Sequence, residues 1–489
     1  MKQIQNFVNG KYVNGTSVFD NINPATGAVI AQVQEADSAV VDAAVVAARA
    51  AMNGPWGRAT VAERASLLRR ISAGIQDRFE EFVAAESADT GKPLEVCRSM
   101  DVPRAIQNFS SFASTLESTG QASFLTEFGE GRTALNYAVR KPLGVVAVIV
   151  PWNLPLLLLT WKLGPAIGSG NAVVVKPSEE TPQTATLLAE VMKDASAPDG
   201  VYNVVHGFGV DSAGGYLTEH PDIDGVTFTG STATGSAIMR SVAARVLPVS
   251  FELGGKNPAI VFADADIEKT LDGLTRSVFF NTGQVCLCTE RVYVELPIFQ
   301  QIVDGLAQRA RDLEFGPSSG EADPQGRTTI GPLISAEHRE KVLSYYRMAE
   351  ESGATVVTGG GVPDLADDRA DGFWIEPTLW TGLSQDSAPM REEVFGPVAG
   401  LIPFDTEEEA IALANDTVYG LAASVWTQDI HRGHRVAQSL RVGMAWVNTW
   451  YLRDLRSPFG GMGMSGIGRE GGVHSFDFFS EPTNVCVQL

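Results

Sequence analysis

The stretch LGVVAVIVPWNLPLLLLTWKLGPAIGSGNAVVVK (143–176) decides the fold class. It contains two runs of β-branched residues, 145–150 and 172–176, on either side of a helix-length apolar segment at 156–168. That alternation is typical of a buried parallel sheet whose strands are joined by helices. The apolar part is long enough to span a membrane, but a glycine, two prolines and an asparagine divide it. We therefore expect a strand, a turn, a helix and a second strand.

The same alternation continues through most of the chain. Further strands are expected at 201–205, 226–229, 258–262, 291–295, 354–358, 398–404, 422–426 and 443–447, and further helices at 183–194, 232–244, 335–352 and 406–415. The first 118 residues look mostly helical after a short β start, with Ala-rich amphipathic runs at 38–52 and 61–88. This pattern predicts an α/β protein with two large domains and a doubly wound, nucleotide-binding layout.

Composition limits the classes of partner. The 489 residues carry 37 Lys and Arg against 58 Asp and Glu, a formal charge of −21, and no basic run interrupts this balance. A nucleic-acid or membrane surface is therefore not expected as a partner. The four cysteines form no disulfide framework and the N-terminus has no apolar export segment, so we expect a cytoplasmic protein. The acidic field would repel an anionic substrate unless local arginines reverse it.

Two segments fit neither large domain. ALNYAVRKP (134–142) alternates like an exposed strand, and FDFFSEPTNVCVQL (476–489) is strand-like and apolar for a tail. Because edge strands of this kind usually need a partner, we expect the two segments to pair with each other or with another subunit. The alternative is that each is local cover for its own domain.

A candidate nucleophile lies in NTGQVCLCTERVYVE (281–295), where Cys286 and Cys288 follow a glycine and lead into a strand. A thiol reacts as its thiolate, which needs some exposure and nearby hydrogen-bond donors. A buried, inert cysteine is the commoner role and remains the alternative. Metal ligation is not expected, because no second Cys or His pair lies at finger-like spacing and the six histidines are scattered.

Two further polar residues stand out against apolar surroundings. Glu252 in SFELGGKNPAIVF (250–262) ends a β run, where burial would raise its pKa toward a value suited to a general base. The alternative is an ion pair with Lys256. Asn153 in PWNLP (151–155) follows a strand at the end where doubly wound sheets bind ligands. Its amide could donate to an oxyanion, or it could simply tie the turn.

The combination of motifs resembles the aldehyde dehydrogenase superfamily over essentially the whole chain. PWNLP, VKPSEETP, FTGSTATG, FELGGKNP, NTGQVCLCTER, EEVFGP and SPFGGMGMSGIGREGG occur in the order and spacing of that family. The resemblance implies a Rossmann-type NAD-binding domain formed by 1–118 and 142–252, and an α/β catalytic domain at 253–471. It also implies a small β oligomerisation arm formed by 119–141 and 472–489, in a homodimer or homotetramer.

By the family's pattern Cys286 is the nucleophile, Glu252 the general base and Asn153 the oxyanion amide. The resemblance implies that the Cys286 thiolate adds to an aldehyde, that hydride then leaves to a nicotinamide, and that Glu252 activates the water that hydrolyses the thioester. Relatives that transfer the acyl group to CoA lack this glutamate, so a free acid is the expected product. Cys288 matches no role in the family and is expected to be a packing residue.

The expected cofactor is NAD and no metal is expected. No G-x-G-x-x-G is present, so the dinucleotide prediction depends on FTGSTATG (228–235) at the start of a helix, where N–H groups attract phosphate. The resemblance implies that Glu179 faces the adenosine ribose, where a carboxylate would bond the ribose hydroxyls and repel a 2′-phosphate, which favours NAD over NADP. The resemblance assigns these positions to the cofactor: Pro151, Trp152, Lys176, Ser178, Glu179, Gly209, Phe228, Thr229, Gly230, Ser231, Thr234, Leu253, Gly254, Glu393 and Phe395.

Arginines narrow the substrate class. At the positions of Arg104 and Arg453 many family members carry apolar residues that line the substrate tunnel. Arginine forks match carboxylates, so these two, together with Arg456, predict an anionic aldehyde, although Arg456 could instead pair with Asp454. LRDLRSPFGG and GQVCLCTERVYVE resemble the muconic semialdehyde branch of the family, and 2-hydroxymuconic 6-semialdehyde is the substrate we expect. The alternatives are 2-aminomuconic 6-semialdehyde, a general aliphatic or betaine-type aldehyde, and a non-catalytic binding protein on the same fold.

Overall fold

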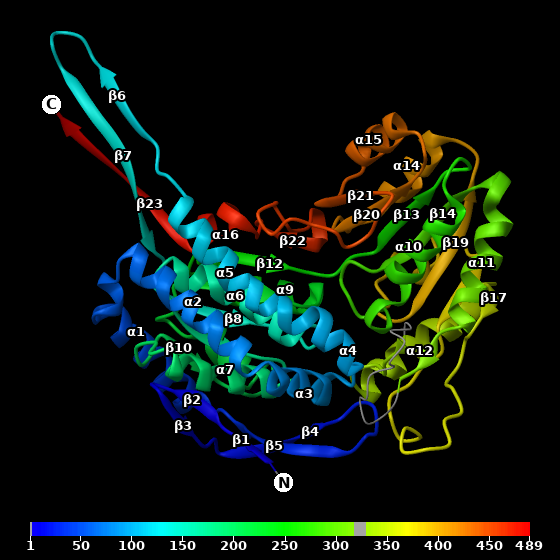
Figure 1. Cartoon of the computed structure of the whole chain (residues 1–489), viewed down its shortest axis with the longest axis horizontal. Helices are drawn as coiled ribbons and strands as arrows, with labels where there is room; N and C mark the ends of the chain where they lie inside the picture. Colours follow the sequence, from blue (N-terminus) through cyan, green and yellow to red (C-terminus); the bar gives the residue numbers. More distant parts are fainter. Residues whose placement is uncertain (1, 317–328) are drawn as a thin grey trace.

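The computed structural model describes residues 2–316 and 329–489. The first large sheet has eight strands, and the five at its centre run parallel (Figure 1). Their parallel order follows from the β-branched runs of the sequence, which fill both faces of the sheet with apolar side chains. In spatial order the strands are β22 (Gly466–Ile467), β12 (Val249–Glu252), β11 (Gly225–Thr229), β8 (Val145–Ile149), β9 (Ala172–Lys176), β10 (Tyr202–Val204), β2 (Asn6–Val8) and β3 (Lys11–Val13).

Helices cover both faces of this sheet, and three of them begin and end within a residue of the predicted bounds. The helix that follows Gly230 is capped by Ser231, whose hydroxyl accepts a hydrogen bond from the Thr234 N–H (3.1 Å). The amphipathic run at 61–88 divides into two helices at Arg78. The helices of this part are α1 (Ser38–Asn53), α2 (Val61–Asp77), α3 (Phe79–Thr90), α5 (Val102–Ser118), α6 (Pro155–Gly168), α7 (Gln183–Asp194), α8 (Ala213–Glu219) and α9 (Thr232–Ala243).

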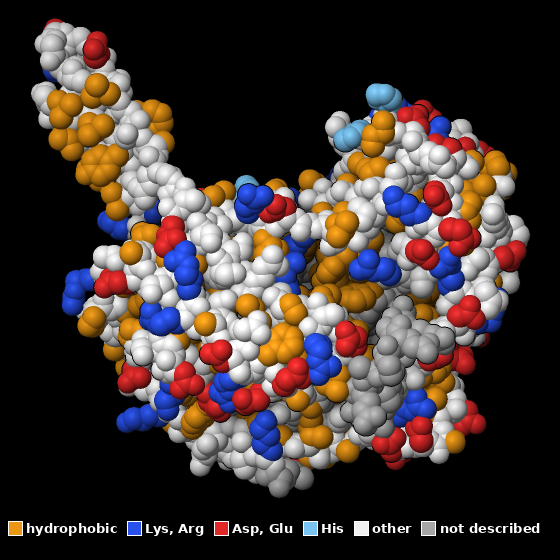
Figure 2. All heavy atoms as spheres, viewed as in Figure 1, with side chains coloured by type: hydrophobic (Ala, Val, Ile, Leu, Met, Phe, Trp, Pro, Cys, Tyr) orange, Lys and Arg blue, Asp and Glu red, His pale blue; other side chains and the backbone are white. Residues whose placement is uncertain are grey.

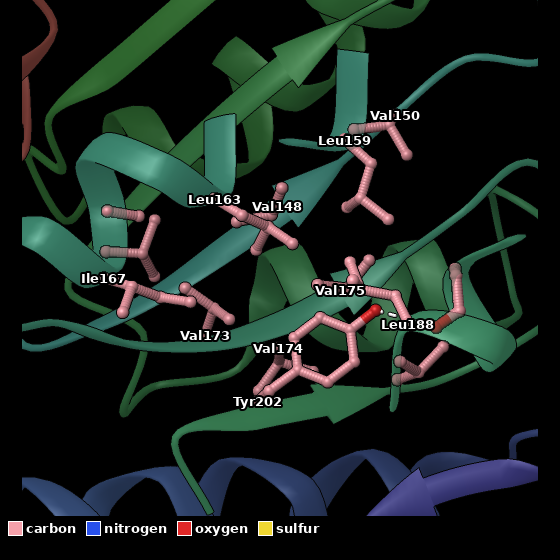
Figure 3. Packing of buried hydrophobic residues seen from close by; sticks show 14 of the residues in the cluster. Val148, Val150, Leu159, Leu163, Ile167, Val173, Val174, Val175, Leu188 and Tyr202 are labelled. Atoms are coloured by element: carbon pink, nitrogen blue, oxygen red, sulfur yellow. Dashed lines mark hydrogen bonds between the residues drawn. The ribbon is translucent and has the colours of Figure 1, made fainter. Parts of the chain in front are cut away.

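The core of this domain lies between the sheet and its helices. Figure 3 shows Leu163 of α6 pointing toward Val148 of β8, and both side chains are fully buried. Tyr202 of β10 is also buried, and its hydroxyl donates to the carbonyl of Ala185 in α7 (2.8 Å). The phenol therefore adds apolar area to the core while its polar atom keeps a hydrogen bond, as a buried hydroxyl requires.

The second large sheet has seven strands, and the predicted strands at 258–262, 291–295, 354–358, 398–404, 422–426 and 443–447 all belong to it. One strand, Thr378–Thr381, was not predicted. In spatial order the strands are β17 (Thr355–Thr358), β18 (Thr378–Thr381), β19 (Val398–Phe404), β14 (Thr289–Glu295), β13 (Asn257–Val261), β20 (Ala422–Trp426) and β21 (Met444–Val447), of which only β17 is antiparallel to its neighbour.

Alternate residues of the interior strand β13 point to opposite faces of this sheet. Ala259 and Val261 pack with the helices α10 (Ile267–Phe279) and α11 (Phe299–Arg311). Ile260 packs on the other face, where the core contains residues of α14 (Glu407–Asn415) and α15 (Ile430–Ser439). The strand is therefore buried on both faces, which explains why its sequence is a continuous apolar run. Helix α12 (Ala336–Glu351) lies beside the edge of the sheet near β17 (Figure 1).

A three-stranded antiparallel sheet projects from the body as an arm (Figure 1). Its strands are β6 (Ser123–Glu127), β7 (Thr133–Pro142) and β23 (Ser480–Gln488). The central pairing runs from Ser480 opposite Pro142 to Gln488 opposite Ala134. The prediction that the two unassigned segments pair with each other is therefore confirmed.

The large sheets do not follow the chain in simple order. Strand β22 lies within the predicted catalytic segment 253–471, yet it pairs antiparallel with β12 of the first sheet. Helix α16 (Gly472–Phe478) lies within the predicted arm segment 472–489, yet its Phe476 packs edge-on against Phe112 of α5, with 6.0 Å between ring centroids. The arm strand itself begins at Ser480. The division into three domains stays a prediction, since sheet membership alone does not define domain boundaries.

The remaining elements are short. No helix in residues 2–316 and 329–489 is both long and apolar enough to cross a membrane. The short elements are β1 (Lys2–Ile4), β4 (Ser17–Ile22), β5 (Val29–Glu35), the 3₁₀ turns Trp56–Arg58, Phe280–Gly283, Leu296–Ile298 and Gly463–Ser465, α4 (Leu94–Val96), the π turn Cys97–Asp101, β15 (Glu314–Phe315), β16 (Thr329–Ile330) and α13 (Ala388–Arg391).

Candidate active site

Two connected cavities lie where the carboxyl ends of the first sheet face the second sheet. The first, about 390 Å³, is bordered by the ends of β8, β9 and β11 and by the N-terminus of α9. The second, about 240 Å³, contains Cys286, Glu252 and Asn153. The two cavities share Pro151, Trp152, Thr229, Gly230 and Ser231. The fold therefore brings the three predicted catalytic residues together at the end of the cavity that was predicted to hold a dinucleotide.

Cys286 follows a tight turn whose residues Asn281 and Thr282 both have a left-handed backbone. A Cβ at the adjacent Gly283 would lie 1.9 Å from the Gly396 carbonyl oxygen, so this position requires glycine. The thiol is half-buried. Burial and then the charges of Glu252 and Glu393 raise the pKa of Cys286 to about 12, against the opposing charge of Arg453.

Glu252 ends strand β12 and is 3% exposed. Among the described residues neither of its carboxylate oxygens has a hydrogen-bond partner. Burial and then the charge of Glu470 raise the pKa of Glu252 well above its usual range, against the opposing charge of Lys162. The alternative interpretation, pairing with Lys256, is wrong, because Lys256 forms its ion pair with Glu290. A carboxyl group in this state is a stronger base than an exposed glutamate.

Asn153 is 5% exposed and its amide donates to the Gln284 carbonyl (2.8 Å). Asn281 in turn donates to the Asn153 carbonyl (3.1 Å). These bonds join the turn after β8 to the turn before Cys286. A side-chain amide has two N–H donors, so Asn153 retains one for a further acceptor. The two alternatives, tying the turn and donating to an oxyanion, are therefore compatible in one side chain.

Arg104 and Arg453 lie on the same aromatic ring, and neither side chain lines the two cavities, although the charge of Arg453 acts on Cys286. Their guanidinium carbons are 5.8 Å and 4.6 Å from the centroid of Trp161, and Arg453 is also 4.2 Å from the centroid of Phe459. Within the described parts of the chain neither arginine forms an ion pair, and Nη1 of Arg453 is buried without a hydrogen-bond partner. In the part of the chain that the structure describes, the one hydrogen bond of the Arg104 side chain is to Asn108 Oδ1 (3.3 Å).

Burial and then the charge of Arg453 lower the pKa of Arg104 to about 10, and burial also lowers the pKa of Arg453. Two half-buried cations without a carboxylate partner in the described residues are costly, and an anionic group bound to both would relieve that cost. Arg456 is different. Its side chain is exposed and is held by Asp454, with 2.9 Å and 2.7 Å between the bonded atoms. The structure does not bring Arg456 to the cavity.

All fifteen positions predicted to bind the cofactor line one or both cavities. The Nζ of Lys176 lies 2.9 Å from Glu179 Oε2 at the rim of the first cavity. The buried Thr229 hydroxyl has no partner in the described residues, and Gly209 has open space where a Cβ would lie. Together with the free N–H groups at the start of α9, these features fit a dinucleotide with its phosphates at the helix N-terminus.

Several residues of the site were not predicted. His338 and Lys341 of α12 line the second cavity. A buried ion pair joins Lys162 and Glu470, with 2.7 Å between Nζ and Oε1. Both charges act on the pKa of Glu252. The local sequence of α12 shows only an amphipathic helix, so nothing in it distinguishes His338 from a surface residue. Glu470 lies in the glycine-rich motif SPFGGMGMSGIGREGG, and its place in that motif is the one signal in the sequence that could have identified it.

Cys288 is buried, and its Sγ lies 3.6 Å from the Phe280 carbonyl oxygen. Burial raises the pKa of the Cys288 thiol far above its usual range. The thiol lies with Leu154, Val285 and Trp450 in a small apolar cluster. This environment agrees with the expected packing role.

In the described residues no group of three or more His, Cys, Asp or Glu side chains is arranged to hold a metal ion.

Comparison with known proteins agrees with this geometry. The sequence pattern of the "Aldehyde dehydrogenase family" matches residues 12–485. The chain is 57% identical to a 2-hydroxymuconic semialdehyde dehydrogenase of Pseudomonas sp. (strain CF600), covering 100% of both chains. It is 56% identical to a 2-aminomuconic 6-semialdehyde dehydrogenase of Pseudomonas sp., covering 100% of this chain and 99% of the relative.

Among solved structures, the NAD+ complex of an aldehyde dehydrogenase from Bacillus cereus matches with a TM-score of 0.94 and 39% identity, covering 100% of this chain and 97% of that chain. A betaine aldehyde dehydrogenase from Staphylococcus aureus in complex with NAD+ has the same TM-score and 36% identity, covering 99% and 94%. The predicted fold class is thereby confirmed. By sequence over nearly its whole length and by its fold, the chain belongs to the aldehyde dehydrogenase family.

Proposed function

We propose that this enzyme oxidises an aldehyde that carries a carboxylate, with 2-hydroxymuconic 6-semialdehyde as the substrate and NAD as the oxidant. The observation that carries the proposal is the unpaired arginine pair, Arg104 and Arg453, on the ring of Trp161. A half-buried bidentate cation is suited to a carboxylate, and two of them would locally reverse the acidic field of a chain with net charge −21. The names of the similar dehydrogenases support the same substrate class.

The carboxylate held at the arginines would place the aldehyde carbon at Cys286. The Cys286 thiolate adds to that carbon, and the free N–H of Asn153, together with the Cys286 backbone N–H, stabilises the resulting oxyanion. NAD, held by the residues that line the two cavities, would supply the acceptor for the hydride that this carbon must lose. The product of that step is a thioester on Cys286.

Glu252 completes the reaction by removing a proton from a water molecule, which then attacks the thioester carbonyl and releases the acid. Burial among apolar side chains raises the pKa of Glu252 and so strengthens it as a base. Because this base is present, the proposed product is the free dicarboxylic acid. The charges of Lys162 and Arg453 limit how far the pKa rises, which keeps the deprotonated form accessible.

Glu179 is the residue proposed to select NAD. Its carboxylate is partly exposed at the first cavity and is held by Lys176. Ribose hydroxyls would be good donors to this carboxylate, whereas a 2′-phosphate would meet a like charge. The other cofactor positions supply backbone N–H groups, a ring wall and the hydroxyls of Ser231 and Thr234.

A second candidate substrate is 2-aminomuconic 6-semialdehyde, because a Pseudomonas relative that is 56% identical to the chain is a 2-aminomuconic 6-semialdehyde dehydrogenase. The two substrates differ in one hydroxyl or amino group. A steady-state assay of NADH formation should compare both muconic semialdehydes with hexanal and betaine aldehyde. We expect kcat/KM to be highest for the 2-hydroxy compound. A kcat/KM for hexanal equal to that for the muconic semialdehydes would contradict the anionic substrate class. A higher kcat/KM for the 2-amino compound would make that compound, rather than the 2-hydroxy compound, the substrate.

We also propose that the arm makes the enzyme a homodimer or homotetramer in the cytoplasm. Large apolar side chains are exposed on the arm, including Phe124 and Leu125 at 65% each, and Figure 2 shows apolar residues gathered there. Exposed apolar strands of this kind are normally covered by a partner. Four free cysteines fit a reducing compartment. Analytical ultracentrifugation tests the assembly: Leu125→Asp should shift the mass toward the monomer, and a monomeric wild type would contradict it.

A further inference from the structure

The segment 393–395 carries two of the side chains that face the reaction cavity, and its backbone is unusual. Phe395 has φ 62°, in the left-handed region that residues other than glycine rarely adopt. A bulky residue remains in that conformation only where its surroundings hold it there. The ring of Phe395 lies edge-on to Trp152, with 5.5 Å between centroids, and both rings line the cavity that contains Cys286.

Glu290 holds this backbone from one side. Its Oε1 accepts a hydrogen bond from the Phe395 N–H (2.9 Å), and its Oε2 accepts one from the Val394 N–H (3.0 Å). The carboxylate is 5% exposed and forms an ion pair with Lys256, which is also buried. Hydrogen bonds to a charged acceptor are stronger than those between neutral groups, so the two N–H groups are firmly placed.

His338 holds the same residue from the other side. Its Nε2 lies 2.8 Å from the Phe395 carbonyl oxygen, and because that oxygen can only accept, Nε2 must carry the proton. The imidazole packs against both neighbouring rings, 5.3 Å from Trp152 and 6.0 Å from Phe395 between centroids. The peptide groups on both sides of the Phe395 Cα are thus fixed by side chains from two other elements, β14 and α12.

We propose that Glu290 and His338 are positioning residues that clamp Phe395, and with it Glu393, against the nicotinamide end of the cofactor cavity. This inference rests on the proposed function, since it concerns how NAD is held. Glu393 is tied at the same place, because its Oε1 accepts from the Gly255 N–H (2.8 Å), next to Lys256 in the chain. Neither Glu290 nor the Lys256 ion pair reaches the cavity itself, so their effect must pass through the clamped segment.

The most informative pair of variants is His338→Leu and His338→Gln. Leucine removes the donor to Phe395, whereas the side-chain amide of glutamine retains one. Calorimetric titration of NAD without aldehyde should show a roughly tenfold rise in Kd for His338→Leu and about twofold for His338→Gln, as expected for loss and retention of one hydrogen bond. Amide hydrogen exchange of a peptide covering 391–397 in the free enzyme should be faster in His338→Leu.

Glu290→Ala alone leaves Lys256 buried without a partner and can fail to fold. The double variant Lys256→Met with Glu290→Ala removes both charges and should also weaken NAD binding. Tyr345→Phe is the matched control, because Tyr345 donates to Glu392 Oε2 (2.7 Å), one residue before the clamped segment, and does not line the cavity. It should leave the Kd of NAD and the exchange of the peptide unchanged.

Two results would overturn the inference. One is an unchanged Kd of NAD in His338→Leu together with faster amide exchange, since the clamped backbone would then be irrelevant to the cofactor. The other is an equal loss of binding in His338→Leu and His338→Gln, which would assign the effect to the imidazole ring itself. If the wild-type enzyme binds no NAD, the proposed function fails, a result that cannot be confused with either of these.

Discussion

Arg104 and Arg453 share the ring of Trp161, with their guanidinium carbons 5.8 Å and 4.6 Å from its centroid. Two like charges on one ring repel each other, and the charge of Arg453 contributes to the lowered pKa of Arg104. A substrate carboxylate that binds there gains from both cations. The proposed function assigns this pair to ligand binding, because two half-buried arginines without a carboxylate partner in the described residues are costly to a fold.

We predict that Arg104→Ala or Arg453→Ala lowers kcat/KM for a muconic semialdehyde by roughly 10- to 150-fold, as expected for a charge-assisted contact of about 1.5–3 kcal/mol. The loss should appear mainly in KM, because the carboxylate is held equally before and during the reaction. Hexanal, which never uses the contact, should lose little. Arg456→Ala is the matched control in the same loop, since its side chain is exposed and paired with Asp454. Equal losses for charged and uncharged aldehydes would show that the arginines serve the fold.

Cys286→Ala is expected to reduce NADH formation to background, whereas Cys288→Ala should retain most of the activity. The Cys288 thiol packs in an apolar cluster, so its truncation should cost stability of about 1 kcal/mol and little else. Steady-state rates and thermal unfolding of both variants check this. A dead Cys288 variant beside an active Cys286 variant would mean that the nucleophile is misassigned.

Glu252→Gln should produce one equivalent of NADH per active site and then stall. Hydride transfer comes before the step that needs the base, so the thioester forms but is not hydrolysed. Rapid mixing with detection of NADH, followed by intact-mass analysis of the acyl enzyme, measures both events. A variant that is slow without any burst would place Glu252 at an earlier step, such as deprotonation of Cys286.

Glu179→Gln should relax the preference for NAD, because the amide keeps a similar shape but no longer repels a 2′-phosphate. The expected result is a lower KM for NADP with little change in kcat. Lys176 remains in the variant and would then lack its carboxylate partner, which should further favour an added phosphate. If the kinetics with NADP are unchanged, another residue sets the cofactor preference.

The reactivity of Cys286 toward alkylating reagents should increase with pH. Burial, with the charges of Glu252 and Glu393, raises the pKa of Cys286 to about 12, so the thiol is protonated through the neutral range. Because the thiolate is the reactive form, alkylation of the free enzyme by iodoacetamide should rise with pH, by roughly tenfold per unit. The increase should continue beyond the range where an ordinary cysteine levels off. Peptide mass spectrometry isolates the site, and Cys286→Ala provides the blank. A plateau near neutral pH would contradict the direction of the shift.

Much of the fold follows from local sequence, because runs such as 145–150 and 422–426 are apolar on both faces and can only be buried strands. Strand β18 and strand β22 were not predicted. The first is a short run next to a proline, and the second consists of Gly466 and Ile467 in a glycine-rich segment without periodicity. Both become strands only because an existing sheet offers a partner, which is a long-range effect.

The residues of the candidate site that lie in local sequence motifs could be predicted. The residues that only the tertiary fold brings to the site could not. Cys286, Glu252 and Asn153 lie in distinctive local patterns, and the structure brings them to one cavity. Arg453 and Arg456 lie three residues apart in an irregular loop, so sequence spacing could not tell which one faces inward. His338 reaches the cavity only because α12 packs beside the loop that carries Phe395.

Strand β22 links the order of synthesis to the integrity of the catalytic region. Residues 466–467 emerge from the ribosome roughly two hundred residues after Glu252, yet they form the neighbour of the strand that ends at that residue. Until then β12 is an unpaired edge, and such edges recruit other nascent chains into aggregates. A polypeptide that stops before Gly466 therefore lacks more than a tail. It lacks the second partner of β12, and we expect it to need a chaperone during translation rather than to fold as a smaller enzyme.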